Sequence, residues 1–327
     1  MIFTCKNCGG NIVYDPDKKA MACPHCGSLD SEEVVGNPVL DVCTSCGAPM
    51  VYKDHTSATK CPNCGTYTIF EDRVQGEYKP DLIIPFSVSR EKAESILKKE
   101  FGKRPFTPDE FLSYASIQKM EGTYVPFFLY NYYSDINYHA VGTKVRTWSD
   151  SRYHYTETSY YDVYREMDAN FEKVPVDASI EMDDAKMDLM EPYTYNELQE
   201  HQDKFLSGFY AEKYNMGEEE LTPRAEAKVK RDSHELLSKT LAGYSTLTNV
   251  SESINTQKRG VKYALLPVWE YVFGFKGQDY HFHVNGQTGK VLGQTPVDKM
   301  RVIGYGATVF GLITLIGFMI RMALMTI

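Results

Sequence analysis

The chain of 327 residues has room for about two or three domains, and its 43% hydrophobic content is that of a protein that buries a core. With 24% charged residues it is not a disordered polymer. The net charge of −9 resides in the acidic segment 179–220, which holds 12 acids and 3 lysines. Because the remainder is balanced, no basic stretch could neutralise an extended nucleic-acid backbone. The acidic segment is either a solvated surface or a docking site for a basic protein.

All eight cysteines lie in CxxC pairs near the N-terminus, and the stretches that separate the two pairs of each half, 9–22 and 47–60, are equally long. The two halves are repeats in which Cys5 corresponds to Cys43 and Cys23 to Cys61. Four thiolates in two such knuckles form a closed tetrahedral shell, which is typical of structural Zn²⁺. We therefore predict two zinc ions. The ligands of the first are Cys5, Cys8, Cys23 and Cys26, and those of the second are Cys43, Cys46, Cys61 and Cys64.

Two other uses of the cysteines are weaker. A redox pair requires a thioredoxin-like βαβ context, which is absent from this segment, whereas four thiolates are also compatible with an iron–sulfur cluster. His25 and His55 are expected to be bystanders because each half already has four cysteines. A glycine follows each knuckle and predicts a tight turn with positive φ, at Gly9, Gly27, Gly47 and Gly65.

These patterns divide the chain into zinc ribbon one (1–36), zinc ribbon two (37–78), a mainly antiparallel α+β domain (79–300) and a C-terminal membrane anchor (301–327). Residues 11–14 and 20–22 should pair as a hairpin in ribbon one, and residues 76–80 form a linker. After a short apolar run at 82–86, Ser89 is the expected N-cap of an amphipathic helix whose apolar face holds Ala93, Ile96, Leu97 and Phe101.

Aromatic and β-branched residues predict strands at 124–133 and 138–148, a turn, and a return strand at 152–165. The tyrosines of 153–164 are expected to pack in the core and across strands. Loop-rich residues 180–216 precede a helix that begins at Thr222 as N-cap, has Pro223 in its first position and ends near Leu241. Three strands follow, at 245–256, 261–275 and 278–284, with a turn before 290–292. His281 and His283 share a strand face, but a pair without a metal is favoured.

The run 302–320 carries no charge and predicts a transmembrane helix, with a buried core helix as the alternative. The N-terminus has no basic region followed by an apolar one, so we expect no secretory signal. Lys299 and Arg301 precede the run, which favours a tail anchor with the large N-terminal part in the cytosol. A stripe of small residues could let a second helix approach, at Gly304, Ala307, Gly311 and Thr314.

The sequence contains no GxSxG elbow, GxxxxGK[ST] loop or HExxH pair, and we predict that the protein is not an enzyme. Together with the paired ribbons, nine segments carry a resemblance that covers nearly the whole chain: IPFSVS at 84–89, GTYVPFFLY at 122–130, WSD at 148–150, TETSYYDVYR at 156–165, VPVDAS at 174–179, EPY at 191–193, GFYAEKY at 208–214, YALLPVW at 263–269 and VNGQTGKV at 284–291.

In these segments the chain resembles a bacterial family of membrane-anchored zinc-ribbon proteins, often labelled as TFIIB-type or PriA-helicase-like zinc ribbons. The chain has no helicase motor motif, so that activity is not carried over. Similar proteins occur beside phage-shock-type and flotillin-like (SPFH) membrane-stress proteins, and the resemblance therefore implies a membrane platform that recruits cytosolic partners. We expect a non-enzymatic scaffold. The alternative is a nucleic-acid-binding accessory protein of replication or transcription, with Lys18, Lys19, Lys53 and Lys60 as contacts.

Overall fold

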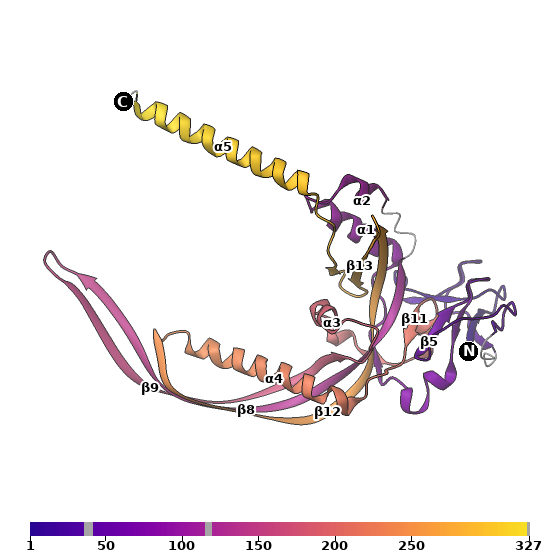
Figure 1. The fold of residues 1–327 in the computed structure, drawn as a ribbon. Coiled ribbons are helices and arrows are strands. Elements are labelled where there is room, and N and C mark those ends of the chain that lie inside the picture. Colours follow the sequence, from indigo (N-terminus) through magenta and orange to yellow (C-terminus); the bar gives the residue numbers. More distant parts are fainter. Residues whose placement is uncertain (36–41, 115–119, 326–327) are drawn as a thin grey trace.

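A computed structural model describes residues 1–35, 42–114 and 120–325 (Figure 1). Its central feature is a large sheet, ten-stranded within the described residues, that contains three very long antiparallel strands. The strand β8 (Glu121–Ser149) lies in the middle and pairs with β9 (His154–Asp177) on one side and β12 (Thr246–Phe275) on the other. At about 3.3 Å per residue, β8 would extend over roughly 95 Å. The three strands form a curved arm that reaches far from the body in Figure 1.

The predicted interruptions of the long strands are wrong. The segments 124–133 and 138–148 are one strand, and so are 245–256 and 261–275. Register shifts in both long ladders absorb the irregular sequence without ending the pairing. The polar residue Ser134 is tolerated because its hydroxyl accepts a hydrogen bond from Ser233 of the covering helix at 3.0 Å.

Shorter strands extend the sheet at the body end of the arm. Among the described strands of this sheet, β7 with β12 and β11 with β8 pair in parallel and the rest pair antiparallel, as the predicted fold class requires. The shorter strands are β5 (Thr56–Lys60), β6 (Tyr67–Ile69), β7 (Leu82–Ile83), β10 (Gln199–Glu200), β11 (Tyr210–Glu212), β13 (Gln278–Asn285) and β14 (Val291–Leu292). The predicted alternation on the β12–β13 hairpin is confirmed, because its aromatic side chains pack into the main core, at Trp269, Tyr271, Phe273, Phe275, Tyr280 and Phe282.

The helix α4 (Glu218–Leu241) lies along the three long strands and buries one side chain every fourth residue. These are Leu221, Ala225, Val229, Ser233 and Leu237; Lys228 is buried as well, and its ammonium donates to the Asp188 carboxylate at 2.6 Å. The predicted start at Thr222 is wrong, since the N-cap is Gly217 and the Thr222 hydroxyl donates to the Glu218 carbonyl. Three acids in the first turn favour the earlier start through the helix dipole, and the buried spacing already begins at Leu221.

The expected core packing of the tyrosines in 153–164 is wrong, although the Tyr161 ring lies edge-on to that of Tyr244 at 6.0 Å. They are exposed by 39% or more, at Tyr153, Tyr155, Tyr160, Tyr161 and Tyr164. The cross-strand part of the prediction holds, because the Tyr155 ring stacks on Trp148 and the Tyr164 ring stacks on His139. Helix α4 reaches Val163, which is buried with Leu237, but Tyr160 and Tyr164 lie on the opposite face of the strand, and Tyr153 and Tyr155 lie beyond the end of the helix.

Small helices complete the body. The predicted α1 (Arg90–Gly102) is confirmed, with Ser89 as N-cap and with Ala93, Leu97 and Phe101 buried. The others are α2 (Asp109–Tyr114), which was not predicted, α3 (Asp184–Met190) and the 3₁₀ helices η1 (Glu71–Arg73), η2 (Gly76–Tyr78), η3 (Tyr195–Glu197) and η4 (Asp203–Leu206). The predicted loop-rich region 180–216 thus contains one short α-helix, two 3₁₀ turns and two short strands.

The zinc ribbons pack against the body. Ribbon one contains β1 (Ile2–Cys5), β2 (Val13–Asp15), β3 (Ala20–Ala22) and β4 (Glu32–Val35), and β2 pairs with β3 as predicted. Ribbon two joins the large sheet, because β5 pairs with β11. The domain boundaries stay predictions, and the one at 36/37 lies outside the described residues.

The C-terminal helix α5 (Lys299–Met325) projects from the body and buries none of its apolar window against the described residues. Over Lys299–Met322 it is long and apolar enough to cross a membrane, at about 1.5 Å per residue against a hydrocarbon layer of about 30 Å. Its base is fixed to the body, where the Phe106 ring lies 5.5 Å from that of Tyr305 and the Asp298 N–H donates to the Phe106 carbonyl. The predicted association of a second helix through the small-residue stripe stays a prediction.

Candidate metal centres and the adjoining pocket

Each group of four predicted ligands comes together with the spacing that a tetrahedral ion requires. The Sγ–Sγ distances are 3.7 Å for Cys5–Cys26 and 3.5 Å for Cys8–Cys23. In ribbon two they are 3.6 and 3.8 Å, for Cys43–Cys64 and Cys46–Cys61. Sulfurs held about 2.3 Å from a tetrahedral Zn²⁺ are separated by about 3.8 Å, whereas a disulfide is about 2.05 Å long. Each cluster could therefore hold one structural zinc ion.

The same backbone turn occurs in all four knuckles. In the leading knuckle the Gly9 N–H donates to the Cys5 carbonyl at 2.8 Å, and the Cys5 N–H donates to the Gly10 carbonyl at 2.8 Å. The glycine has a φ of +72°, and an added Cβ would meet nothing within 4 Å. Conformation rather than space therefore requires glycine here. The prediction of positive φ is confirmed at all four positions, Gly9, Gly27, Gly47 and Gly65.

A hydroxyl two residues after the last cysteine supports each cluster. The Cys26 Sγ lies 2.9 Å from the Ser28 hydroxyl, and this hydrogen bond lowers the pKa of the Cys26 thiol to about 6. At the matching position the Cys64 Sγ lies 3.3 Å from the Thr66 hydroxyl. Burial alone would raise the pKa of Cys64, but hydrogen bonds with the Thr66 side chain and backbone bring it to about 6. Such outer partners favour the thiolate, which is the form that binds metal.

The four histidines considered from the sequence lie outside the two clusters. Among the described residues, only the cysteine clusters bring three or more His, Cys, Asp or Glu ligand atoms together. His55 Nε2 lies 3.7 Å from Glu181 and 3.8 Å from Glu212, so it faces acids rather than a metal-ligand set. His281 is exposed, while burial lowers the pKa of His283 to about 4.

The lysines proposed as nucleic-acid contacts are largely engaged within the protein. Lys18 pairs with Asp15 at 3.3 Å, and Lys53 pairs with Glu181 at 2.5 Å. The Lys60 ammonium lies 5.6 Å from the centre of the Tyr67 ring. Lys19 is exposed at the ribbon-one hairpin.

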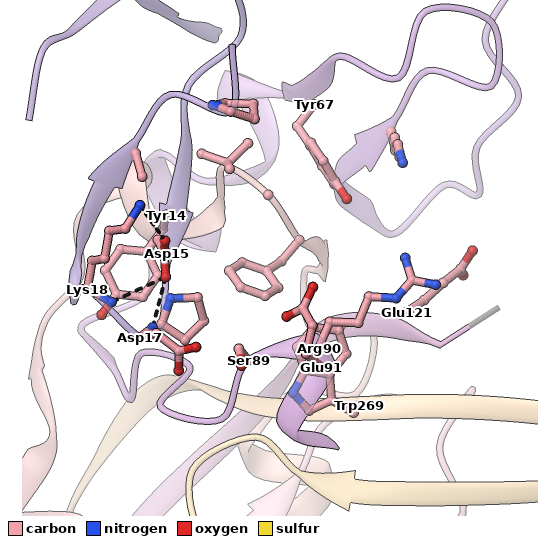
Figure 2. Close-up of a pocket in the computed structure, with 18 of the residues that line it drawn as sticks. Tyr14, Asp15, Asp17, Lys18, Tyr67, Ser89, Arg90, Glu91, Glu121 and Trp269 are labelled. Atoms are coloured by element: carbon pink, nitrogen blue, oxygen red, sulfur yellow. Dashed lines mark hydrogen bonds and ion pairs between the residues drawn. The ribbon is translucent and has the colours of Figure 1, made fainter. Parts of the chain in front are cut away.

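A pocket of about 520 Å³ lies where the two ribbons meet the body (Figure 2). Ribbon one, ribbon two, the start of α1, β8, β11 and β12 all contribute to its wall. Its aromatic lining consists of Tyr14, Tyr67, Phe209, Tyr210 and Trp269. Gly122 permits the close packing of this wall, because a Cβ there would lie 2.7 Å from the Phe209 ring and 3.0 Å from the Trp269 ring.

The charged groups around this pocket are largely paired with one another. Asp17 accepts from Lys92 at 2.6 Å, and this hydrogen bond lowers the pKa of the Asp17 carboxyl. Asp15 pairs with Lys18, and Arg90 pairs with Glu94 at 3.1 Å. The pocket therefore offers aromatic surface with polar edges rather than a strong field of either sign. No sequence pattern pointed to it, because its walls come from segments that are far apart in the chain, from ribbon one to β12.

A second cavity of about 550 Å³ lies between ribbon two and the sheet. Glu270 Oε1 is buried there without a hydrogen-bond partner among the described residues, although the residue as a whole is half-buried. Burial raises the pKa of the Glu270 carboxyl to about 7, with a further contribution from Glu212. Glu270 is thus a carboxyl that the fold keeps partly protonated near neutral pH.

A comparison with known proteins places the chain in a family. The chain is 34% identical over 320 residues to a protein of Bacillus subtilis (strain 168) that is named "Uncharacterized protein YdjG", and 94% of each chain is covered. The chain belongs to the YdjG family. No family model and no solved structure matches it. Because the alignment spans nearly all of both chains, membership rests on the whole architecture rather than on the ribbons alone.

Proposed function

We propose that the protein is a non-enzymatic, tail-anchored membrane protein whose cytosolic zinc ribbons form a docking site for other proteins. The observation that carries this proposal is the aromatic pocket at the junction of both ribbons and the body. Its volume lies within the range of about 300–1,000 Å³ that is typical of binding sites. Tyrosine and tryptophan are also the side chains that most often dominate protein–protein binding energy.

A segment of a partner protein suits this pocket better than nucleic acid does. Nucleic-acid binding draws its affinity from cations that neutralise phosphates. Here Lys18 and Lys53 would first have to leave Asp15 and Glu181. An apolar or aromatic peptide side chain could instead enter between Tyr67 and Trp269 without breaking an ion pair.

The two ends of the chain support the remaining parts of the proposal. Four thiolates complete the shell of a tetrahedral zinc and leave no position for a reactive water, so the metal would maintain a shape rather than catalyse a reaction. At the other end, Lys299 and Arg301 lie on the body side of the apolar helix, which favours a cytosolic body. The resemblance of the sequence to membrane-stress zinc-ribbon proteins makes SPFH/flotillin-like or phage-shock-type membrane proteins the partners that we propose.

The proposal is tested by photo-crosslinking in intact cells. A photoreactive amino acid replaces Tyr67 in the pocket or, as the matched control, the exposed Tyr160 on the arm. We expect the position-67 probe to capture a membrane-associated protein of the proposed classes, and Cys61→Ser to abolish the capture. Products that are equal at both positions, or unaffected by Cys61→Ser, would contradict the pocket's role. A salt-sensitive nucleic-acid shift by the full-length protein, lost on Lys19→Gln, would favour the alternative function.

A further inference from the structure

The end of the arm is a two-stranded hairpin that no other described helix or strand covers; at its base the Val145 N–H donates to the Ser245 hydroxyl at 3.2 Å, and the Lys144 ammonium lies 5.3 Å from the centre of the Tyr244 ring. The pairing of β12 with β8 stops at Thr246 and Thr143, whereas β8 and β9 remain paired up to Ser149 and His154. Helix α4 has already ended at Leu241. A two-stranded hairpin without a covering layer is only marginally stable in water. We call this terminal part, residues 144–159, the tip. Its surface is available for a contact outside the chain.

One face of the tip presents an ordered aromatic platform. Trp148 and Tyr155 lie opposite each other in the ladder, and their rings stack at 5.4 Å with an interplanar angle of 13°. The Arg146 guanidinium lies 5.5 Å from the Trp148 ring, and the Tyr153 ring packs edge-on against Tyr155. Trp148 nevertheless stays 44% exposed. Side chains alternate along a strand, so Arg146 and Trp148 continue the face that α4 covers further back.

The tip also carries an excess of basic side chains in an acidic protein. The tip contains Lys144, Arg146 and Arg152 as basic residues and Asp150 and Glu157 as acidic ones. Its formal charge is therefore +1, whereas the whole chain has a net charge of −9. Exposed tryptophan and tyrosine combined with basic side chains are typical of groups at a membrane–water interface. An anionic leaflet attracts such cations, and each contributes roughly a fivefold gain in affinity.

The arrangement of the molecule brings the tip and the membrane helix to one side. Both the arm and α5 extend from the body toward the left of Figure 1. The direction of α5 is set at its base, where Arg301 pairs with Asp109 and the Thr107 hydroxyl lies 2.8 Å from that of Thr295. A bilayer crossed by α5 would therefore lie on the side toward which the tip curves.

We propose that the tip rests on the anionic leaflet of the membrane in which α5 is anchored, through Trp148, Tyr155 and the three basic side chains. The body would then be attached at two separated points, which limits its rotation about α5. This inference rests on the proposed function only in requiring that α5 spans the membrane. Lipid is favoured over a protein partner because the exposed aromatic and basic groups coincide with the side that faces the bilayer.

The two tryptophans of the chain make a direct test possible. Full-length protein is reconstituted into vesicles of phosphatidylcholine alone or of an equimolar mixture with phosphatidylglycerol, in which part of the acyl chains are brominated at a shallow position to quench tryptophan. Trp269 is 5% exposed within the body, so quenching reports on Trp148. We expect strong quenching in the anionic vesicles, at most weak quenching in the neutral ones, and none with Trp148→Phe. Flotation of the vesicles separately measures whether α5 anchors the protein.

A charge-matched pair of variants decides whether the tip itself makes the contact. The tip variant K144Q/R146Q/R152Q should lose most of the quenching, because three basic contributions of about fivefold each are removed. The control K6Q/K19Q/K230Q removes the same charge from exposed positions elsewhere and should retain the quenching of Trp148. Protein that floats but shows no quenching of Trp148 would overturn the lipid contact and leave the platform to a protein partner. Equal effects of both variants would also overturn it, and protein that does not float would overturn the anchor and with it this inference.

Discussion

Loss of one zinc site should destabilise the body far more than loss of the other. The equivalent first ligands Cys5 and Cys43 are both 1% exposed, so Cys5→Ser and Cys43→Ser are matched changes. Ribbon one contributes Phe3, Ile12 and Tyr14 to the main core of the body. The cluster around the second site is separate and consists only of residues of ribbon two, which contributes Ala58, Ile69 and Val74 to the main core.

The magnitude follows from the side chains that ribbon one buries. Fully burying a large apolar side chain contributes about 1.5–3 kcal/mol, so Phe3, Ile12 and Tyr14 together represent roughly 5–9 kcal/mol. Two hydrogen bonds add about 1 kcal/mol each, from Tyr14 N–H to the Ser207 carbonyl at 2.8 Å and from the Ser207 hydroxyl to the Ile12 carbonyl at 2.7 Å. A zinc-free ribbon one would lose most of this, because such small modules depend on metal to fold.

Hydrogen exchange of the detergent-solubilised full-length protein measures the difference, with the zinc content of each variant determined in parallel. Residues 203–209 form η4 and its exit, and the Phe205 ring packs 5.1 Å from that of Tyr14. We expect Cys5→Ser to remove the protection of this segment, and Cys43→Ser to retain it while losing one zinc ion. Equal loss in both variants, or full protection in a Cys5→Ser protein that has lost its zinc, would refute the reasoning.

Three further changes give sharp expectations. Ser28→Ala combined with Thr66→Val should weaken zinc binding about 10–100-fold in competition with a chelator, and unchanged affinity would show that the hydroxyls are incidental. Glu270 has a folded pKa of about 7 against 4.5 unfolded, so its protonation stabilises the fold below pH 4.5 and this contribution is lost as the pH rises through 7. In denaturant titrations, the effect of Glu270→Gln on the unfolding free energy should therefore be more stabilising at pH 8 than at pH 5, by up to roughly 3 kcal/mol. An effect of the same size at both pH values would contradict this. Leu237→Ala should lower the unfolding free energy by about 2–5 kcal/mol, whereas Leu236→Ala at the exposed neighbour should change it little. Similar losses in both variants would contradict the packing of α4 on the sheet through Leu237.

The features that the sequence predicted are those determined by residues close together in the chain. Metal-ligand spacing placed all eight cysteines, and the turn chemistry of Gly9 and its equivalents depends on backbone groups only a few residues away. The apolar spacing of α1 and the alternation around Trp269 and Phe282 are likewise local patterns that the core then uses. Local periodicity sufficed wherever one face of an element meets the core.

The features that could not be predicted depend on what lies across the sheet. A strand interior containing Ser134 was expected to break, but partners on both sides satisfy its backbone, and a serine of α4 meets its hydroxyl. Tyr160 and Tyr164 have strand-like alternation whether or not a layer covers their face, so the pattern alone could not reveal that α4 packs on the other face, at Val163. For α4 itself the first-turn acids from Glu218 were a usable signal that Pro223 obscured.

The pocket and the metal sites depend on each other. Ribbon one supplies one wall through Tyr14, Asp15 and Lys18, and Cys23, a predicted ligand, is itself part of the lining. The opposite walls belong to the body and to ribbon two. Removing the first zinc should therefore remove the wall that ribbon one supplies and open the pocket to solvent. A partner that binds there would stabilise the metal-bound form, so partner affinity and zinc affinity at the first site should rise and fall together.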